Sequence, residues 1–194
     1  MADTVLYLVR HAESRPDFTL PEADWPLSER GHSQAQELVP VLSALKIDVL
    51  YSSPYVRAMD TIKPAAARLG IGIRVHDDLR ERELSKHGLG DAFWPTVQRS
   101  WAERDFALQG CESYNDCQRR IVPAIHGIAA AHPGRTIALA SHGNALAVYL
   151  EHVHGSFGYE RWRAMRNPDL FRIAYGSAGA RWDGVQMPTS VGVA

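Results

Sequence analysis

Three short polar segments of the chain carry side chains suited to binding an oxyanion. The first contains Arg10, His11 and Ser14, the second contains Arg57, and the third contains His142. Each segment directly follows an apolar run of the kind that forms a buried strand. Ligands of open α/β sheets bind outside the carboxyl ends of the strands. The spacing therefore predicts that the three segments meet at one edge of a sheet.

The charge that would gather at this edge favours a tetrahedral dianion such as phosphate. Guanidinium forks bind phosphate oxygens in pairs, and two arginines and two histidines make a strongly electropositive pocket. Helices expected to start near Pro54 and Gly143 would add backbone N–H donors and the positive ends of their dipoles. Glu81 follows a short further strand and is expected on the same side of the sheet.

The elements that must position these residues alternate between strand and helix. Apolar runs predict strands at residues 5–9, 49–51, 73–75, 136–140, 171–175 and 180–182. Helical spacing predicts a helix capped by Ser28, one from Pro54 to Gly70, one over 114–131 and one carrying Leu146. This order predicts an α/β fold, a three-layer sandwich with a mainly parallel central sheet and helices on both faces.

Residues 83–112 break the alternation, because they are rich in glycine and show no clean period. We expect a single domain over 1–194, in which this stretch is an excursion covering the site. Its aromatic residues are Phe93, Trp94, Trp101 and Phe106. Two roles are open for them: they could shape an apolar pocket for part of a ligand, or form a small satellite core under the loop.

Composition excludes several classes of protein. Hydrophobic residues make up 45% of the chain and charged residues 22%, which is typical of a globular protein and not of a disordered or coiled-coil one. Lys and Arg number 21 against 22 Asp and Glu, a net charge of −1. We therefore expect no nucleic-acid partner, since non-specific binding needs a basic excess.

The expected compartment is the cytoplasm. The two cysteines, Cys111 and Cys117, cannot build a disulfide framework. The simplest interpretation is that both are reduced thiols, as in cytosolic proteins. No basic start followed by a long apolar core indicates a signal peptide, and the run at 5–9 is too short to span a bilayer, so no membrane association is expected.

Five segments in order along the chain resemble motifs of the histidine phosphatase superfamily, the phosphoglycerate-mutase-like proteins. These are residues 8–14, 26–31, 52–61, 79–82 and 141–144. Each motif alone is weak, but five in order, over nearly the whole chain, are a strong signal. The family's sheet carries one antiparallel edge strand, which the last strand segment is expected to supply.

The resemblance implies an activity and a role for each residue. The activity is phosphomonoester hydrolysis without a metal or other cofactor, on a small-molecule phosphomonoester or a phosphoprotein. The implied roles are nucleophile for His11, forming a phosphohistidine, proton donor for Glu81, and phosphoryl binding for Arg10, Arg57 and His142. Ser14 either touches the phosphate or caps a turn.

Three alternatives stand beside this hypothesis. A cofactor-dependent phosphoglycerate mutase would return the phosphoryl group to the substrate, and a catalytically weak member of the family would only bind phosphate. A serine hydrolase using Ser141 is disfavoured, because no histidine follows at the required distance. Asp17 stands where mutases carry an asparagine and is not expected to bind phosphate, while His152 and His154 are expected on the surface and His87 in solvent.

Overall fold

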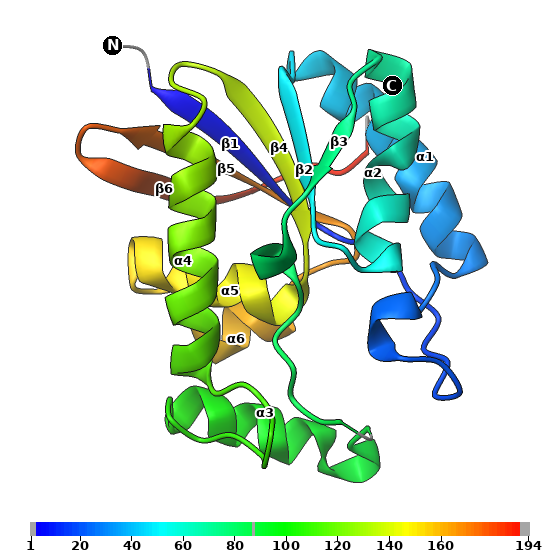
Figure 1. Cartoon of the computed structure of the whole chain (residues 1–194), viewed down its shortest axis with the longest axis vertical. Helices are drawn as coiled ribbons and strands as arrows, with labels where there is room; N and C mark the ends of the chain where they lie inside the picture. The colour runs from blue at the N-terminus through cyan, green and yellow to red at the C-terminus, as the bar shows by residue number, and fades with distance from the viewer. Residues whose placement is uncertain (1–2, 87, 191–194) are drawn as a thin grey trace.

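The computed structural model describes residues 3–86 and 88–190, and its strands form a six-stranded sheet. The strands are β1 (Thr4–Arg10), β2 (Val49–Ser52), β3 (Ile73–Val75), β4 (Thr136–Ser141), β5 (Asp169–Gly176) and β6 (Gly179–Met187). Their order is β3-β2-β4-β1-β5-β6, and β1 to β4 run parallel (Figure 1). The four parallel strands therefore deliver their carboxyl ends to one edge, where the predicted site segments begin.

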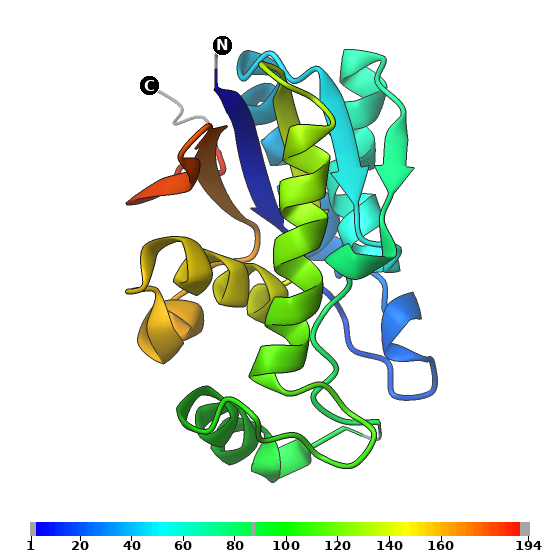
Figure 2. The same ribbon diagram turned by 60° about the vertical axis from the view of Figure 1, so that its left-hand side comes forward.

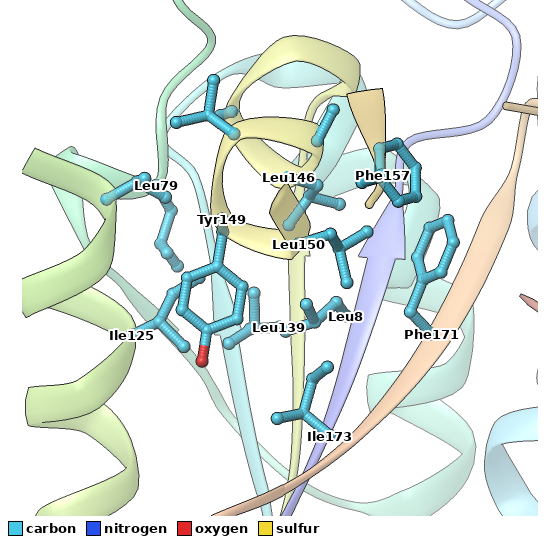
Figure 3. Packing of buried hydrophobic residues seen from close by; sticks show 14 of the residues in the cluster. Leu8, Leu79, Ile125, Leu139, Leu146, Tyr149, Leu150, Phe157, Phe171 and Ile173 are labelled. Carbon is cyan, nitrogen blue, oxygen red and sulfur yellow. The ribbon is translucent and has the colours of Figure 1, made fainter. Parts of the chain in front are cut away.

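Helices cover both faces of the sheet (Figure 1, Figure 2). One face carries α1 (Glu29–Ala44) and α2 (Val56–Leu69), and the other carries α4 (Tyr114–Ala130), α5 (Gly143–His154) and α6 (Gly158–Arg163). Leu146 and Leu150 of α5 belong to one buried cluster with Leu8 of β1 and Leu139 of β4 (Figure 3). The predicted three-layer α/β architecture is confirmed.

The ends of the helices follow from local side-chain chemistry. The Ser28 hydroxyl accepts a hydrogen bond from the Gly31 N–H and begins α1, and Gly70 ends α2 with a φ of 69°. The predicted start of α2 at Pro54 is wrong by two residues. The Ser53 hydroxyl accepts from the Tyr55 N–H, and this turn keeps the chain out of the helix until Val56. No helix of the described residues is long and apolar enough to cross a membrane.

The one strand that opposes the others lies inside the sheet. β5 runs antiparallel to both of its neighbours, β1 and β6, so β6 at the edge points the same way as β1. The expectation that the last segment supplies an opposing strand at the edge is therefore wrong. A two-residue turn separates Gly176 from Gly179, and a connection this short joins only antiparallel neighbours, so it adds β6 outside β5.

Residues 83–112 contain regular structure that the sequence did not reveal. A 3-10 turn, η3 (Gly90–Ala92), leads into α3 (Phe93–Ala102), which lies beyond the N-terminal end of α4 (Figure 2). Trp94 packs edge-on against Trp162, Trp101 against Tyr114, and the Arg99 guanidinium covers Phe106. Phe93 and Trp101 pack against the main buried cluster, which includes Val97, whereas Trp94 is 53% exposed.

Candidate active site

His11 lies at the carboxyl end of β1, and one of its two ring nitrogens makes a hydrogen bond to the backbone. Its backbone N–H donates to the Ser141 carbonyl, which keeps β1 and β4 together up to the site. The ring Nδ1 lies 2.7 Å from the Ala12 carbonyl oxygen. Because a carbonyl oxygen only accepts, Nδ1 must carry the proton, and the lone pair is left on Nε2.

The environment of His11 keeps its imidazole neutral. The side chain is buried, and burial is the largest cause that lowers the pKa of His11 well below its usual value. The positive charges of Arg57 and Arg10 lower the pKa of His11 further. At neutral pH the ring therefore presents an unprotonated nitrogen inside an electropositive surrounding.

His142 faces His11 from the end of β4, where it is the residue before α5. The two ring centroids are 5.2 Å apart. The His142 Nε2 lies 2.7 Å from the Ser53 hydroxyl oxygen, while Nδ1 is buried and has no hydrogen-bond partner among the described residues. Burial, followed by the charge of Arg57, lowers the pKa of His142 well below its usual value. The unpaired Nδ1 is the ring atom with capacity left for a ligand.

Arg10 is the last residue of β1, directly before His11, and its side chain lies against the start of α5. Its Nη1 donates to the Met165 carbonyl over 2.9 Å, and its buried Nε has no partner among the described residues. A Cβ on Gly143 would come within 3.2 Å of the guanidinium. Glycine at this position therefore lets the guanidinium reach the first turn of the helix, next to the two histidines.

Arg57 enters the site from the first turn of α2 and is only 3% exposed. The Thr61 hydroxyl donates to the Arg57 carbonyl and accepts from the Ala12 N–H, so one side chain ties α2 to the end of β1. The guanidinium carbon lies 4.9 Å from the Tyr55 ring centroid and 5.8 Å from that of Trp25. These contacts fix both the backbone and the head of Arg57.

The Arg57 guanidinium is already occupied by a carboxylate. Glu22 belongs to the 3-10 turn η1 (Glu22–Asp24), in the loop after β1. Nη1 of Arg57 donates to the Glu22 carbonyl over 2.6 Å, and Nη2 donates to the Glu22 Oε1 over 2.7 Å. This ion pair places an internal anion within the electropositive pocket.

The side chain of Glu81 extends to the N-terminal end of α5, the helix that starts directly after His142. Glu81 follows the 3-10 turn η2 (Asp77–Leu79) after β3. Its Oε1 accepts from the backbone N–H groups of Arg82 and Ala145, and its Oε2 accepts from that of Asn144 over 3.2 Å. The carboxyl group therefore lies at the N-terminus of α5, one turn from His142.

The structure brings together His11, His142, Glu81, Arg10 and Arg57 at the carboxyl edge of the sheet. The backbone of Ser14 pairs with Leu27 as an isolated bridge, and its hydroxyl makes no hydrogen bond to these five residues in the described part of the chain. Asp17 accepts hydrogen bonds from Thr19 in its own turn. The buried Ser141 hydroxyl donates to the Leu79 carbonyl, a structural role that leaves no free nucleophile.

The remaining histidines do not form a metal centre in the described part of the chain. His152 and His154 are exposed, as predicted, and bond to Gln118 and Ser156 respectively. Within residues 3–86 and 88–190 no group of three or more His, Cys, Asp or Glu side chains could hold a metal ion. His87 lies outside the described residues.

Sequence reasoning missed the residues that hold the site together. Ser53 and Thr61 stood within the recognised segment 52–61, so their spacing carried a signal that was not assigned a role. Asn167, whose Nδ2 donates to the His11 carbonyl over 2.9 Å, and Glu22 carried no signal. Both act across loops, where no periodic pattern indicates which residues will meet.

Comparison with known proteins agrees with this geometry. The model of the histidine phosphatase superfamily (branch 1) matches residues 6–186. The glucosyl-3-phosphoglycerate phosphatase of Mycobacterium tuberculosis is 29% identical over 161 residues, which cover 73% of this chain and 71% of that protein. A protein of Cronobacter sakazakii named "Probable phosphoglycerate mutase GpmB" is 28% identical over 183 residues, covering 88% of this chain and 84% of the relative.

A solved structure shows the same likeness over the whole fold. The mycobacterial glucosyl-3-phosphoglycerate phosphatase in complex with inorganic phosphate superimposes with a TM-score of 0.77 and 26% identity, over 97% of this chain and 99% of the other. The family model covers most of the chain, and the segments it includes are those that meet at the carboxyl edge of the sheet. The chain therefore belongs to the histidine phosphatase superfamily, branch 1.

Proposed function

We propose that the chain is a phosphomonoester hydrolase that needs no metal ion and acts through a phosphohistidine on Nε2 of His11. The observation that carries the proposal is the hydrogen bond from Nδ1 to the Ala12 carbonyl, which directs the lone pair to Nε2. A nitrogen nucleophile must be unprotonated, and the lowered pKa of His11 meets that need. The phosphatase named among its relatives supports hydrolysis as the class of reaction.

In the first step Nε2 of His11 attacks phosphorus, and the bond from phosphorus to the ester oxygen breaks. Negative charge on the phosphoryl oxygens is stabilised by the free Nε of Arg10 and the Nδ1 of His142, together with Arg57 once its fork is released. Donors fixed before the reaction contribute more to phosphoryl transfer than additional covalent chemistry. The two guanidinium groups supply the positive charge that Mg²⁺ supplies in other phosphoryl-transfer sites.

Glu81 protonates the departing ester oxygen, so that an alcohol leaves rather than an alkoxide. Its Oε1 accepts two backbone hydrogen bonds and its Oε2 only one, so Oε2 is the oxygen with room for the proton. In the second step the Glu81 carboxylate takes a proton from water. That water attacks the phosphohistidine, the P–N bond breaks, and inorganic phosphate and free His11 result.

A phosphoglycerate mutase is the second candidate, because one relative carries that name. Such an enzyme would return the phosphoryl group to the glycerate instead of to water. We favour hydrolysis of a phosphomonoester, small or on a protein, since the mycobacterial glucosyl-3-phosphoglycerate phosphatase is similar over 97% of this chain.

The test is phosphate release from a chromogenic aryl phosphate in excess EDTA, with wild type beside His11→Ala. We expect turnover in wild type that survives EDTA, and a loss of at least about a thousandfold in the variant. Activity that disappears with EDTA would contradict metal independence. Conversion of 3- to 2-phosphoglycerate without phosphate release would establish the mutase, and phosphate binding with neither reaction would establish a binding protein.

A further inference from the structure

Glu22 is a carboxylate that contacts a cluster of side chains suited to binding phosphate. Its backbone carbonyl and its Oε1 each take up one hydrogen of a terminal guanidinium nitrogen of Arg57, at 2.6 and 2.7 Å. Arg57 is otherwise shielded by Tyr55 and Trp25. One arm of the fork that a phosphoryl group would use is therefore engaged by a carboxylate of the same protein.

A carboxylate and a phosphate dianion cannot both stay on this fork. Like charges a few ångströms apart repel strongly where water is scarce, and Arg57 is only 3% exposed. The Glu22 side chain, by contrast, is 34% exposed. It can turn toward solvent and be hydrated, whereas Arg57 is held in place by α2.

We propose that Glu22 is an internal competitor for the phosphate site, which occupies Arg57 in the empty enzyme and must yield when a phosphoryl group binds. The proposal rests on the proposed function, in that it takes the pocket around His11 to be the phosphate site. It makes Glu22 a determinant of phosphate affinity, separate from the residues that carry out the reaction.

Competition of this kind depends on pH, because only the ionised carboxylate competes. Burial raises the pKa of the Glu22 carboxyl, and the charges of Glu81 and Glu83 raise it further. The positive charge of Arg57 acts in the opposite direction. Tyr55 is the other titratable group that faces Glu22. Falling pH protonates Glu22 and removes the negative charge that competes for Nη2 of Arg57. Phosphate should therefore bind more tightly, relative to a variant without this carboxylate, as pH falls.

The experiment measures the dissociation constant of inorganic phosphate by titration calorimetry between about pH 5 and about pH 8. Wild type is compared with Glu22→Gln, which keeps the size of the side chain and removes its charge. The ratio of the two constants at each pH cancels the ionisation of phosphate itself. Asp24→Asn is the matched control, since Asp24 lies on the same turn but is exposed.

We expect Glu22→Gln to bind phosphate about tenfold more tightly than wild type at the alkaline end, which corresponds to about 1.4 kcal/mol. The ratio should approach one at the acid end, and Asp24→Asn should follow wild type throughout. Glu22→Ala, which removes the side-chain hydrogen bond to Arg57 as well as the charge, should also tighten binding. Equal or weaker binding by both Glu22 variants at the alkaline end would overturn the proposal and make Glu22 a support for Arg57.

This measurement separates the proposal from the proposed function. Tighter phosphate binding by Glu22→Gln in a protein that shows no His11-dependent turnover would sustain the competitor and refute the hydrolase. Normal turnover with no tightening would refute the competitor alone. Failure of wild type and all variants to bind phosphate would overturn both.

Discussion

The two halves of the site differ in how they are held. The strand-end half contains His11, His142 and Glu81, which are fixed by the sheet and by backbone groups at the start of α5. The loop half contains Glu22 and Trp25, which come from the segment after β1 and contact the guanidinium of Arg57. Under the proposed function, the groups that break and form bonds rest on strand ends and a helix start, while the proposed competitor for phosphate rests on a loop.

Arg57 is the residue at which the two halves meet. The backbone carbonyl of Arg57 accepts a hydrogen bond from Thr61, which connects it to the rigid half. The guanidinium contacts Glu22 and Trp25 of the loop half. Substitutions in the strand-end half should therefore reduce kcat, and substitutions in the loop half should mainly change KM.

Among the substitutions that compare the two halves, Glu81→Gln is expected to give the largest effect, because it removes the proposed proton donor from the rigid half. For an alkyl phosphate, whose alkoxide leaves poorly, kcat should fall by about 10²–10⁴-fold. For an aryl phosphate with an acidic phenol the loss should be far smaller. Steady-state kinetics on both substrates checks this, and equal losses on both would assign Glu81 a structural role.

Thr61→Val should give an intermediate effect, because it cuts the link between the halves. The buried Ala12 N–H would lose its acceptor at a cost of about 1–3 kcal/mol of unfolding free energy. With His11 and Arg57 less well placed, kcat should fall by about tenfold with little change in KM. Thr61→Ser keeps the hydroxyl and should restore kcat; if it does not, the hydrogen bonds are not what positions the two residues.

Two tryptophan substitutions should give the smallest effects and sharpen the contrast between regions. Trp25→Ala removes a ring 5.8 Å from the Arg57 guanidinium, and the loss of about 0.5–1 kcal/mol of cation–π attraction should raise KM by a few-fold. Trp94→Ala, at an exposed position of α3 that contacts Trp162, should leave kcat/KM unchanged. A larger loss of kcat/KM from Trp94→Ala than from Trp25→Ala would place the substrate against α3 instead.

The difference between the halves also explains what the sequence could predict. His11, His142, Arg10, Arg57 and Glu81 follow strands or open helices, so periodicity and the geometry of α/β sheets predict that they meet. Three features depend on contacts that the spacing of hydrophobic residues does not indicate. The first two are the pairing of Glu22 with Arg57 and the antiparallel direction of β5. The third is the helix α3, in which only Val97 and Ser100 are buried.

The central claim, a phosphohistidine on His11, is tested most directly by trapping it. The enzyme is mixed with an aryl phosphate, quenched in alkali within one turnover, digested, and analysed by mass spectrometry for a phosphoryl group. The account predicts an alkali-stable, acid-labile modification on the peptide that contains His11, absent from His11→Ala. Phosphate release with an unmodified His11 throughout the first turnover, or a phosphoryl group on another residue, would contradict it.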